Sequence, residues 1–162
     1  MLRSDLRKWA VAEQMIPNAP VNAACSTMIN ASSDTVWHLL TSVTNWPRWY
    51  GYLKNAQLDG LFSVETRLTY GGLIKHRLRI ARVTPGKMVM LYGTMAGYSG
   101  ITRWDVKTMA EERTKVTFTE SSNGPLIALL YGSGRLEKHL KLWLAALKAE
   151  AERGLVMFRT QK

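Results

Sequence analysis

The stretch that decides the fold reads Ile29-Asn-Ala-Ser-Ser-Asp-Thr-Val-Trp-His-Leu-Leu40 and is followed by Asn45-Trp-Pro-Arg-Trp49. Its serines and aspartate suit the N-cap of a helix. The apolar stripe of that helix consists of Val36, Trp37, Leu39 and Leu40. Pro47 suits the first turn of a second short helix over 45–50. The stretch therefore predicts two short helices, the first of which ends near Ser42.

Extended segments surround these helices on both sides. Small and β-branched residues over 21–29 predict a first strand. After Gly51 the apolar residues recur with period two, which is typical of an antiparallel meander. Its expected strands cover 53–58, 64–70, 73–83, 88–95, 101–108 and 115–120, and turn residues such as those in Asp59-Gly60 and Pro85-Gly86 separate them.

The C-terminal part returns to helical periodicity from Pro125 onward. The apolar stripe comprises Leu129, Leu136, Leu140, Trp143, Leu144, Leu147 and Ala151. Charged residues occupy the opposite face, so one side is expected to meet a core and the other to meet water. Gly132 and Gly134 predict either a kink or a start of the long helix near Arg135, since an interior glycine costs about 1 kcal/mol relative to alanine.

Three segments are expected along the chain. Residues 1–20 form an N-terminal helix or arm, because Leu2, Leu6 and Trp9 have helical spacing and prolines follow. Residues 21–154 form the single folded domain, and 155–162 form a tail. The predicted fold class is α+β, with a curved antiparallel sheet of six to seven strands wrapped around the long C-terminal helix.

This order of elements is that of the helix-grip fold. The stretches 29–40 and Asn45-Trp-Pro-Arg-Trp49 resemble the opening of the polyketide cyclase/dehydrase branch of the START-like (SRPBCC) superfamily, and Thr114-Lys-Val-Thr-Phe-Thr-Glu120 resembles its last strand. The resemblance covers residues 21–153. It implies a cavity between sheet and helix that holds an apolar or aromatic small molecule. It also implies a mouth formed by 45–52, Gly71-Gly72 and 93–100.

Composition limits the class of protein and its partners. A chain of 162 residues with 46% hydrophobic and 21% charged residues fits one globular domain. The single cysteine, Cys25, excludes an internal disulfide and favours a cytoplasmic location. The net charge of +10 favours anionic partners, but no run of bases exceeds the pair Arg7-Lys8. A nucleic-acid or membrane footprint therefore requires a patch assembled by the fold.

Two polar residues fall on strand faces that alternation turns toward the long helix. His76 lies between Ile74 and Leu78, and Glu120 follows Phe118. A histidine and a carboxylate in one cavity can act as general base and acidic partner. The structural alternative is a hydrogen-bonded core histidine and a glutamate at the solvent rim.

The expected ligand contacts combine the inward strand residues with aromatic side chains and methionines. They are Trp46, Trp49, Leu68, Tyr70, Ile74, His76, Leu78, Met90, Tyr92, Met95, Tyr98, Trp104, Phe118 and Tyr131. By contrast, the helical positions of Trp37 and Trp143 indicate structural roles. His38 and His139 have no spaced metal partner, so no metal is expected, and no nucleotide-cofactor motif occurs.

These observations give three functional hypotheses. The first is a binding or carrier protein for a hydrophobic small molecule such as a lipid, quinone, polyketide or other aromatic compound. The second is a cofactor-independent polyketide cyclase or dehydratase that uses His76 and Glu120. The third is a basic protein that docks on an anionic membrane or on RNA through its net charge; no DNA partner is expected.

Overall fold

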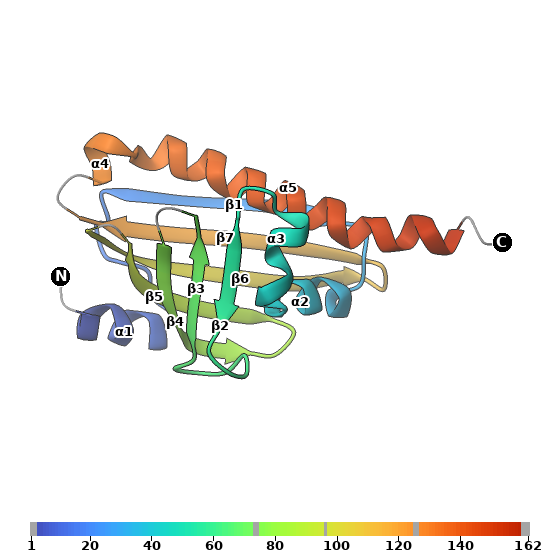
Figure 1. Ribbon diagram of the computed structural model, residues 1–162, viewed down its shortest axis with the longest axis horizontal. Helices are drawn as coiled ribbons and strands as arrows, with labels where there is room; N and C mark the ends of the chain where they lie inside the picture. Colours follow the sequence, from blue (N-terminus) through green and yellow to red (C-terminus); the bar gives the residue numbers. More distant parts are fainter. Residues whose placement is uncertain (1–2, 73–74, 96, 125–126, 160–162) are drawn as a thin grey trace.

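The computed structural model describes residues 3–72, 75–95, 97–124 and 127–159 (Figure 1). Its elements, in chain order, are α1 (Arg3–Val11), β1 (Val21–Ile29), α2 (Ser33–Thr41), η1 (Val43–Asn45), α3 (Trp46–Trp49), β2 (Asn55–Leu58), β3 (Arg67–Gly71), β4 (Lys75–Thr84), β5 (Met88–Met95), β6 (Tyr98–Ala110), β7 (Arg113–Asn123), α4 (Ile127–Leu130) and α5 (Gly132–Arg159).

Within the described ranges the strands form one seven-stranded sheet in the order β1-β7-β6-β5-β4-β3-β2. Every neighbouring pair is antiparallel, and β2 to β7 follow one another as a meander. Helices α2 and α3 lie in the connection that carries the chain from β1 at one edge to β2 at the other. The predicted α+β helix-grip architecture is confirmed.

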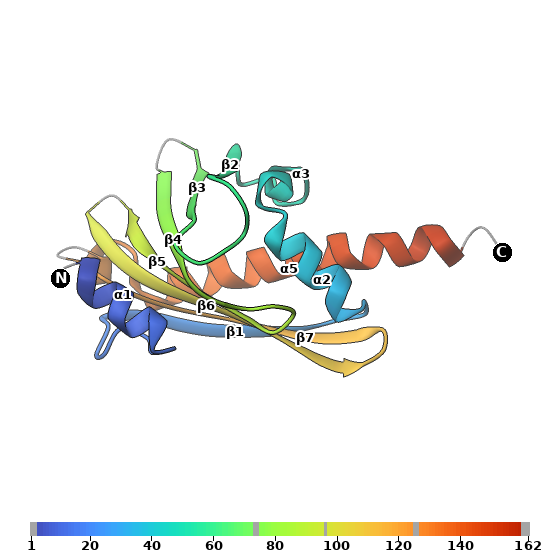
Figure 2. The ribbon, with the colours of Figure 1, turned by 90° about the horizontal axis from the view of Figure 1, so that it is seen from below.

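The two faces of the sheet are covered by different helices, as Figure 2 shows. The long helix α5 runs along β1, and α2 and α3 lie on the same side as α5. Helix α1 packs against β4, β5 and β6 on the other side. The buried residues accordingly form two separate apolar clusters, one inner cluster beneath α5 and one outer cluster beneath α1.

Strand β5 contributes to both clusters because its sequence is apolar without interruption from Met88 to Tyr92. Val89 and Leu91 point to the inner cluster. Met88, Met90 and Tyr92 point to the outer cluster, against Leu6 and Ala10 of α1 and against Ile16. Alternation along a strand buried on both faces produces this division.

Three local expectations differ from the structure. Helix α5 starts at Gly132, whose φ of +70° separates it from α4, rather than near Arg135. It continues to Arg159, into the expected tail. The stretch 93–100, expected as a loop of the mouth, consists mostly of paired strand, because β5 and β6 remain in register as far as Met95 and Tyr98.

Candidate functional site

The inner cluster is organised around Trp46, which is 1% exposed. Its indole Nε1 donates a hydrogen bond to the carbonyl of Leu40 at 3.2 Å, which fixes the orientation of the ring. Three other aromatic rings meet it edge-on, with centroids at 5.6 Å for Tyr70, 5.7 Å for Trp104 and 5.2 Å for Trp143. Edge-on pairs at these distances are favourable beyond the apolar area that they bury.

Two small cavities adjoin the inner cluster, and residues of α5 line only the first of them. The first, of about 30 Å³, is lined by Trp46, Tyr70, Leu78, Leu91, Thr102, Trp104, Phe118, Glu120, His139, Leu140 and Trp143. The second, of about 20 Å³, is lined by Tyr70, His76, Leu78, Gly93, Thr94, Tyr98, Gly100, Thr102 and Glu120. Each is large enough for a water molecule or two. Four residues line both spaces and therefore form the partition between them: Tyr70, Leu78, Thr102 and Glu120.

Glu120 is the carboxylic acid of this partition. Its register partner on β6 is Thr102, whose Oγ1 donates to Glu120 Oε2 at 3.5 Å, and Ser122 Oγ donates to Oε1 at 3.2 Å. Burial raises the pKa of Glu120 to about 7, and the two hydroxyl donors, which favour the ionised form, partly oppose that rise. Near neutral pH the carboxyl group is therefore able to give or take a proton.

This raised pKa predicts a pH-dependent stability. The folded state binds a proton that the unfolded state releases at lower pH, so stability is lost as the pH rises from about 4.5 through about 7. The wild type is expected to lose roughly 3 kcal/mol of unfolding free energy relative to Glu120→Gln as the pH rises through this range, because glutamine does not titrate. Urea denaturation at a series of pH values measures it. The exposed Glu112→Gln serves as control, and an equal pH profile for both variants would contradict the prediction.

His76 lies in the second cavity and stacks on Tyr70. Their ring centroids are 4.5 Å apart and the planes are within 7° of parallel. Burial and, to a smaller extent, the positive charge that His139 can carry together lower the pKa of His76 to about 4. His76 is thus a neutral imidazole at neutral pH, able to hydrogen-bond but weak as a base.

His139 adds a second imidazole from α5. Its Nδ1 lies 3.4 Å from the hydroxyl oxygen of Tyr50, and burial lowers its pKa. Burial also raises the pKa of Tyr50 to about 12, so this phenol is protonated throughout the neutral range. The site therefore offers neutral hydrogen-bonding groups within an aromatic enclosure.

The structure brings most of the predicted ligand contacts together. Those that line the two cavities are Trp46, Tyr70, His76, Leu78, Tyr98, Trp104 and Phe118, and Glu120, predicted as a catalytic residue, lines both cavities with them. Trp49, Leu68 and Tyr131 belong to the surrounding inner cluster. The prediction is wrong for Met90 and Tyr92, which lie beneath α1 on the opposite face of the sheet. Ile74 and the side chain of Met95 lie outside what the structure describes.

Other lining residues were missed. Thr102 faces inward beside Trp104, and Leu91 alternates with the outward Met90 and Tyr92. His139, Leu140 and Trp143 come from α5, where helical spacing places His139 one turn before Trp143. The polar residue His139 on this otherwise apolar stripe was the feature of the sequence that could have indicated the site.

Two further observations concern the described residues alone. They contain no group of three or more His, Cys, Asp or Glu side chains arranged to hold a metal ion. None of the helices in this part of the chain is long and apolar enough to span a bilayer.

Solved structures with the same fold come from several bacteria. The Zhui aromatase/cyclase from a Streptomyces species superposes with a TM-score of 0.70 at 15% identity, over 83% of this chain and 94% of that protein. A START superfamily protein from Mycobacterium smegmatis gives 0.67 at 12% identity, over 82% and 97%. A hypothetical protein from Helicobacter pylori gives 0.70 at 17% identity, over 90% and 93%. At such identities the likeness establishes the fold.

Sequence comparison identifies the family. A search of curated protein sequences gave no match. A family model described as polyketide cyclase/dehydrase and lipid transport matches residues 21–159, which comprise the whole sheet and its inner helices but leave out α1. The chain therefore belongs to the polyketide cyclase/dehydrase and lipid transport family.

Proposed function

We propose that this protein binds a flat hydrophobic molecule with one polar end in the space beneath α5. The observation that carries the proposal is a carboxyl group, Glu120, placed among the rings of Trp104, Phe118 and Trp143. Thr102 and Ser122 hydrogen-bond this acid, but burial still raises its pKa, so ionising it at neutral pH costs stability. A ligand that hydrogen-bonds to Glu120 explains why the acid is kept at this position in spite of the lost stability. In a purely structural core the same acid would lower stability without any benefit.

The polar end of the ligand is expected to be a hydroxyl or carbonyl group. Near neutral pH Glu120 can donate a hydrogen bond when protonated and accept one when ionised. The neutral imidazoles of His76 and His139 can likewise donate or accept a hydrogen bond. A permanently charged end group is disfavoured, because this enclosure stabilises neutral forms.

Uptake requires the site to open. The cavities of about 30 Å³ and 20 Å³ are far below the roughly 300–1,000 Å³ of typical ligand pockets. The conformation described here is thus a closed one. Movement of the stacked pair Tyr70 and His76 away from α5 joins the two spaces, because Tyr70 is part of the partition between them.

Native mass spectrometry of protein purified from its own host tests the proposal. We expect a population heavier than the bare chain by the mass of an organic molecule. After extraction with solvent, that mass is expected in the organic phase and the protein returns to the mass of the chain. Bare protein before extraction, together with no thermal shift on adding lipids, quinones or polyketides, would refute ligand binding.

A second candidate is a cofactor-independent cyclase or dehydratase, favoured by one observation: His76 and Glu120 line the same cavity. Their pKa values favour a different division of roles from the one that the sequence suggests. Glu120, at about 7, is matched to proton transfer at neutral pH, and His76, at about 4, is suited to orienting a substrate by hydrogen bonding.

This candidate predicts that Glu120→Gln lowers kcat on a linear poly-β-ketone by at least about a hundredfold, because proton transfer by a positioned group contributes that much. His76→Gln is expected to raise KM more than it lowers kcat. The exposed Glu112→Gln controls for the loss of one carboxylate. Turnover that is equal in Glu120→Gln and Glu112→Gln, or absent in the wild type, would exclude the enzyme.

A further inference from the structure

An arginine-lined hollow lies on the outer face of the sheet, outside the cavity site. It measures about 290 Å³ and is lined by Arg3, Arg67, Arg77, Leu78 and Thr94. Arg3 belongs to α1 and the others to β3, β4 and β5, so residues far apart in sequence meet here. The hollow lies against the smaller inner cavity, since Leu78 and Thr94 line both.

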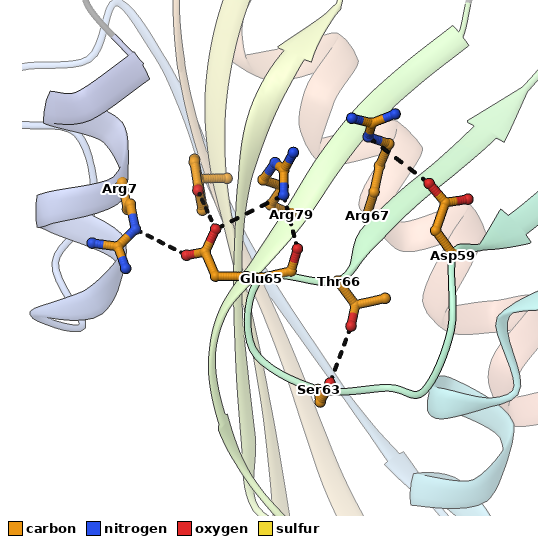
Figure 3. A network of polar contacts seen from close by, with 8 residues as sticks. Arg7, Asp59, Ser63, Glu65, Thr66, Arg67 and Arg79 are labelled. Atoms are coloured by element: carbon orange, nitrogen blue, oxygen red, sulfur yellow. Dashed lines mark hydrogen bonds and ion pairs between the residues drawn. The ribbon is translucent and has the colours of Figure 1, made fainter.

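The acid Glu65 is already paired with arginines outside the lining of this hollow. Figure 3 shows Glu65 between Arg7 of α1 and Arg79 of β4. Its Oε1 accepts a hydrogen bond from Arg7 Nε at 2.9 Å. Its Oε2 accepts a hydrogen bond from the Tyr92 hydroxyl at 3.3 Å and forms an ion pair with Arg79 Nη1 at 3.9 Å. The backbone carbonyl of Glu65 accepts a further bond from Arg79 at 2.9 Å. The Glu65 carboxylate therefore interacts with Arg7 and Arg79 and not with the arginines that line the hollow.

Few negative charges balance the positive charges of the three arginines that line the hollow. Arg67 reaches Asp59 only at 3.9 Å, on the side of β3 away from α1 (Figure 3). Among the described residues, neither Arg3 nor Arg77 forms an ion pair. The register also places Arg67 directly opposite Arg79, an unfavourable like-charge pair. The hollow thus concentrates positive charge that an anion would stabilise.

We propose that this hollow binds a phosphate group. A guanidinium presents paired N–H donors that match phosphate oxygens, and three guanidiniums from three different elements can surround a tetrahedral anion. Thr94, the register partner of Arg77, adds a hydroxyl donor. A soluble phosphate ester and an acidic lipid headgroup share this chemistry. The proposal is independent of the ligand beneath α5.

Two variants that each remove one positive charge test the site. Arg77 lines the hollow, whereas Arg113 is exposed at the start of β7 and lies outside the lining. Isothermal titration with phenyl phosphate and with inorganic phosphate measures the soluble source. Sedimentation with phosphatidylcholine vesicles, with and without phosphatidic acid, measures the lipid source. Circular dichroism verifies that both variants fold.

Arg77→Gln is expected to weaken phosphate binding at least about tenfold, which corresponds to the loss of one charge-assisted hydrogen bond. Arg113→Gln is expected to change phosphate binding less than about twofold. Binding of the soluble phosphates with this pattern supports a small-molecule site. Binding confined to the phosphatidic acid vesicles, with the same pattern, supports a headgroup site. Failure of every probe to bind, or equal losses in the two variants, would overturn the proposal, since equal losses reflect net charge alone.

Discussion

Replacing Trp46 with alanine is expected to lower the free energy of unfolding by about 4 kcal/mol, the range found for large aromatic residues in cores. The side chain is 1% exposed and forms edge-on contacts with Tyr70, Trp104 and Trp143. Its removal also leaves the carbonyl of Leu40 without the indole donor. Urea denaturation followed by circular dichroism measures the loss.

Trp46→Phe separates the two contributions. Phenylalanine retains most of the apolar packing but cannot donate to Leu40, so we expect an intermediate loss. The exposed Tyr52→Ala serves as a control for aromatic truncation in the same region. A loss in Trp46→Ala no greater than that in Tyr52→Ala would contradict the central position given to this tryptophan.

Gly93→Ala is expected to cost at least about 3 kcal/mol, above the usual range for overpacking in a core. A Cβ at this position would approach the carbonyl oxygen of Arg77 and lie 2.8 Å from the Cα of Leu78. These are backbone atoms of the paired strand β4 and cannot move aside without breaking the pairing of Leu78 with Gly93. Glycine is required here because another backbone comes close.

The matched control is Gly51→Ala. No atom lies within 4 Å of a Cβ built there. Its φ is not in the left-handed region. The same substitution should therefore be neutral or slightly stabilising through the unfolded chain. Thermal denaturation compares the two variants, and a Gly93→Ala protein as stable as Gly51→Ala would show that the close approach of β4 and β5 is not maintained.

The sheet and its inward faces were predictable from the sequence because period two is unambiguous where one face is polar. In β4 the outward Lys75, Arg77 and Arg79 alternate with inward residues, which assigned His76 and Leu78 correctly. In β7 the same pattern assigned Phe118 and Glu120 to the cavity side.

The pattern failed where both faces are buried. Met90 and Tyr92 lie in an uninterrupted apolar strand, and periodicity alone does not assign a face to such residues. The deciding fact is that α1 covers the outer side of the sheet, which is a tertiary contact. Residues of α1 thus complete a second core.

The contribution of α5 to the site was missed for a related reason. Trp143 and His139 lie on the apolar stripe that marks the core, and here the lining of the cavity is part of that core. The arginine hollow is equally invisible in sequence, because it joins Arg3, Arg67 and Arg77 across separate elements. Long-range pairing, rather than local pattern, creates both features.

The binding of a neutral apolar fluorophore, N-phenylnaphthylamine, tests most directly whether a hydrophobic ligand binds beneath α5. Two variants carry the same substitution at different positions of that helix. Leu140 lines the cavity and is 3% exposed, whereas Leu142 is 38% exposed on the outer side of α5. We predict that Leu140→Trp, and the smaller Leu140→Phe, reduce probe binding while Leu142→Trp leaves it unchanged, with all three folded by circular dichroism. Equal binding by wild type, Leu140→Trp and Leu142→Trp would contradict a ligand site beneath α5.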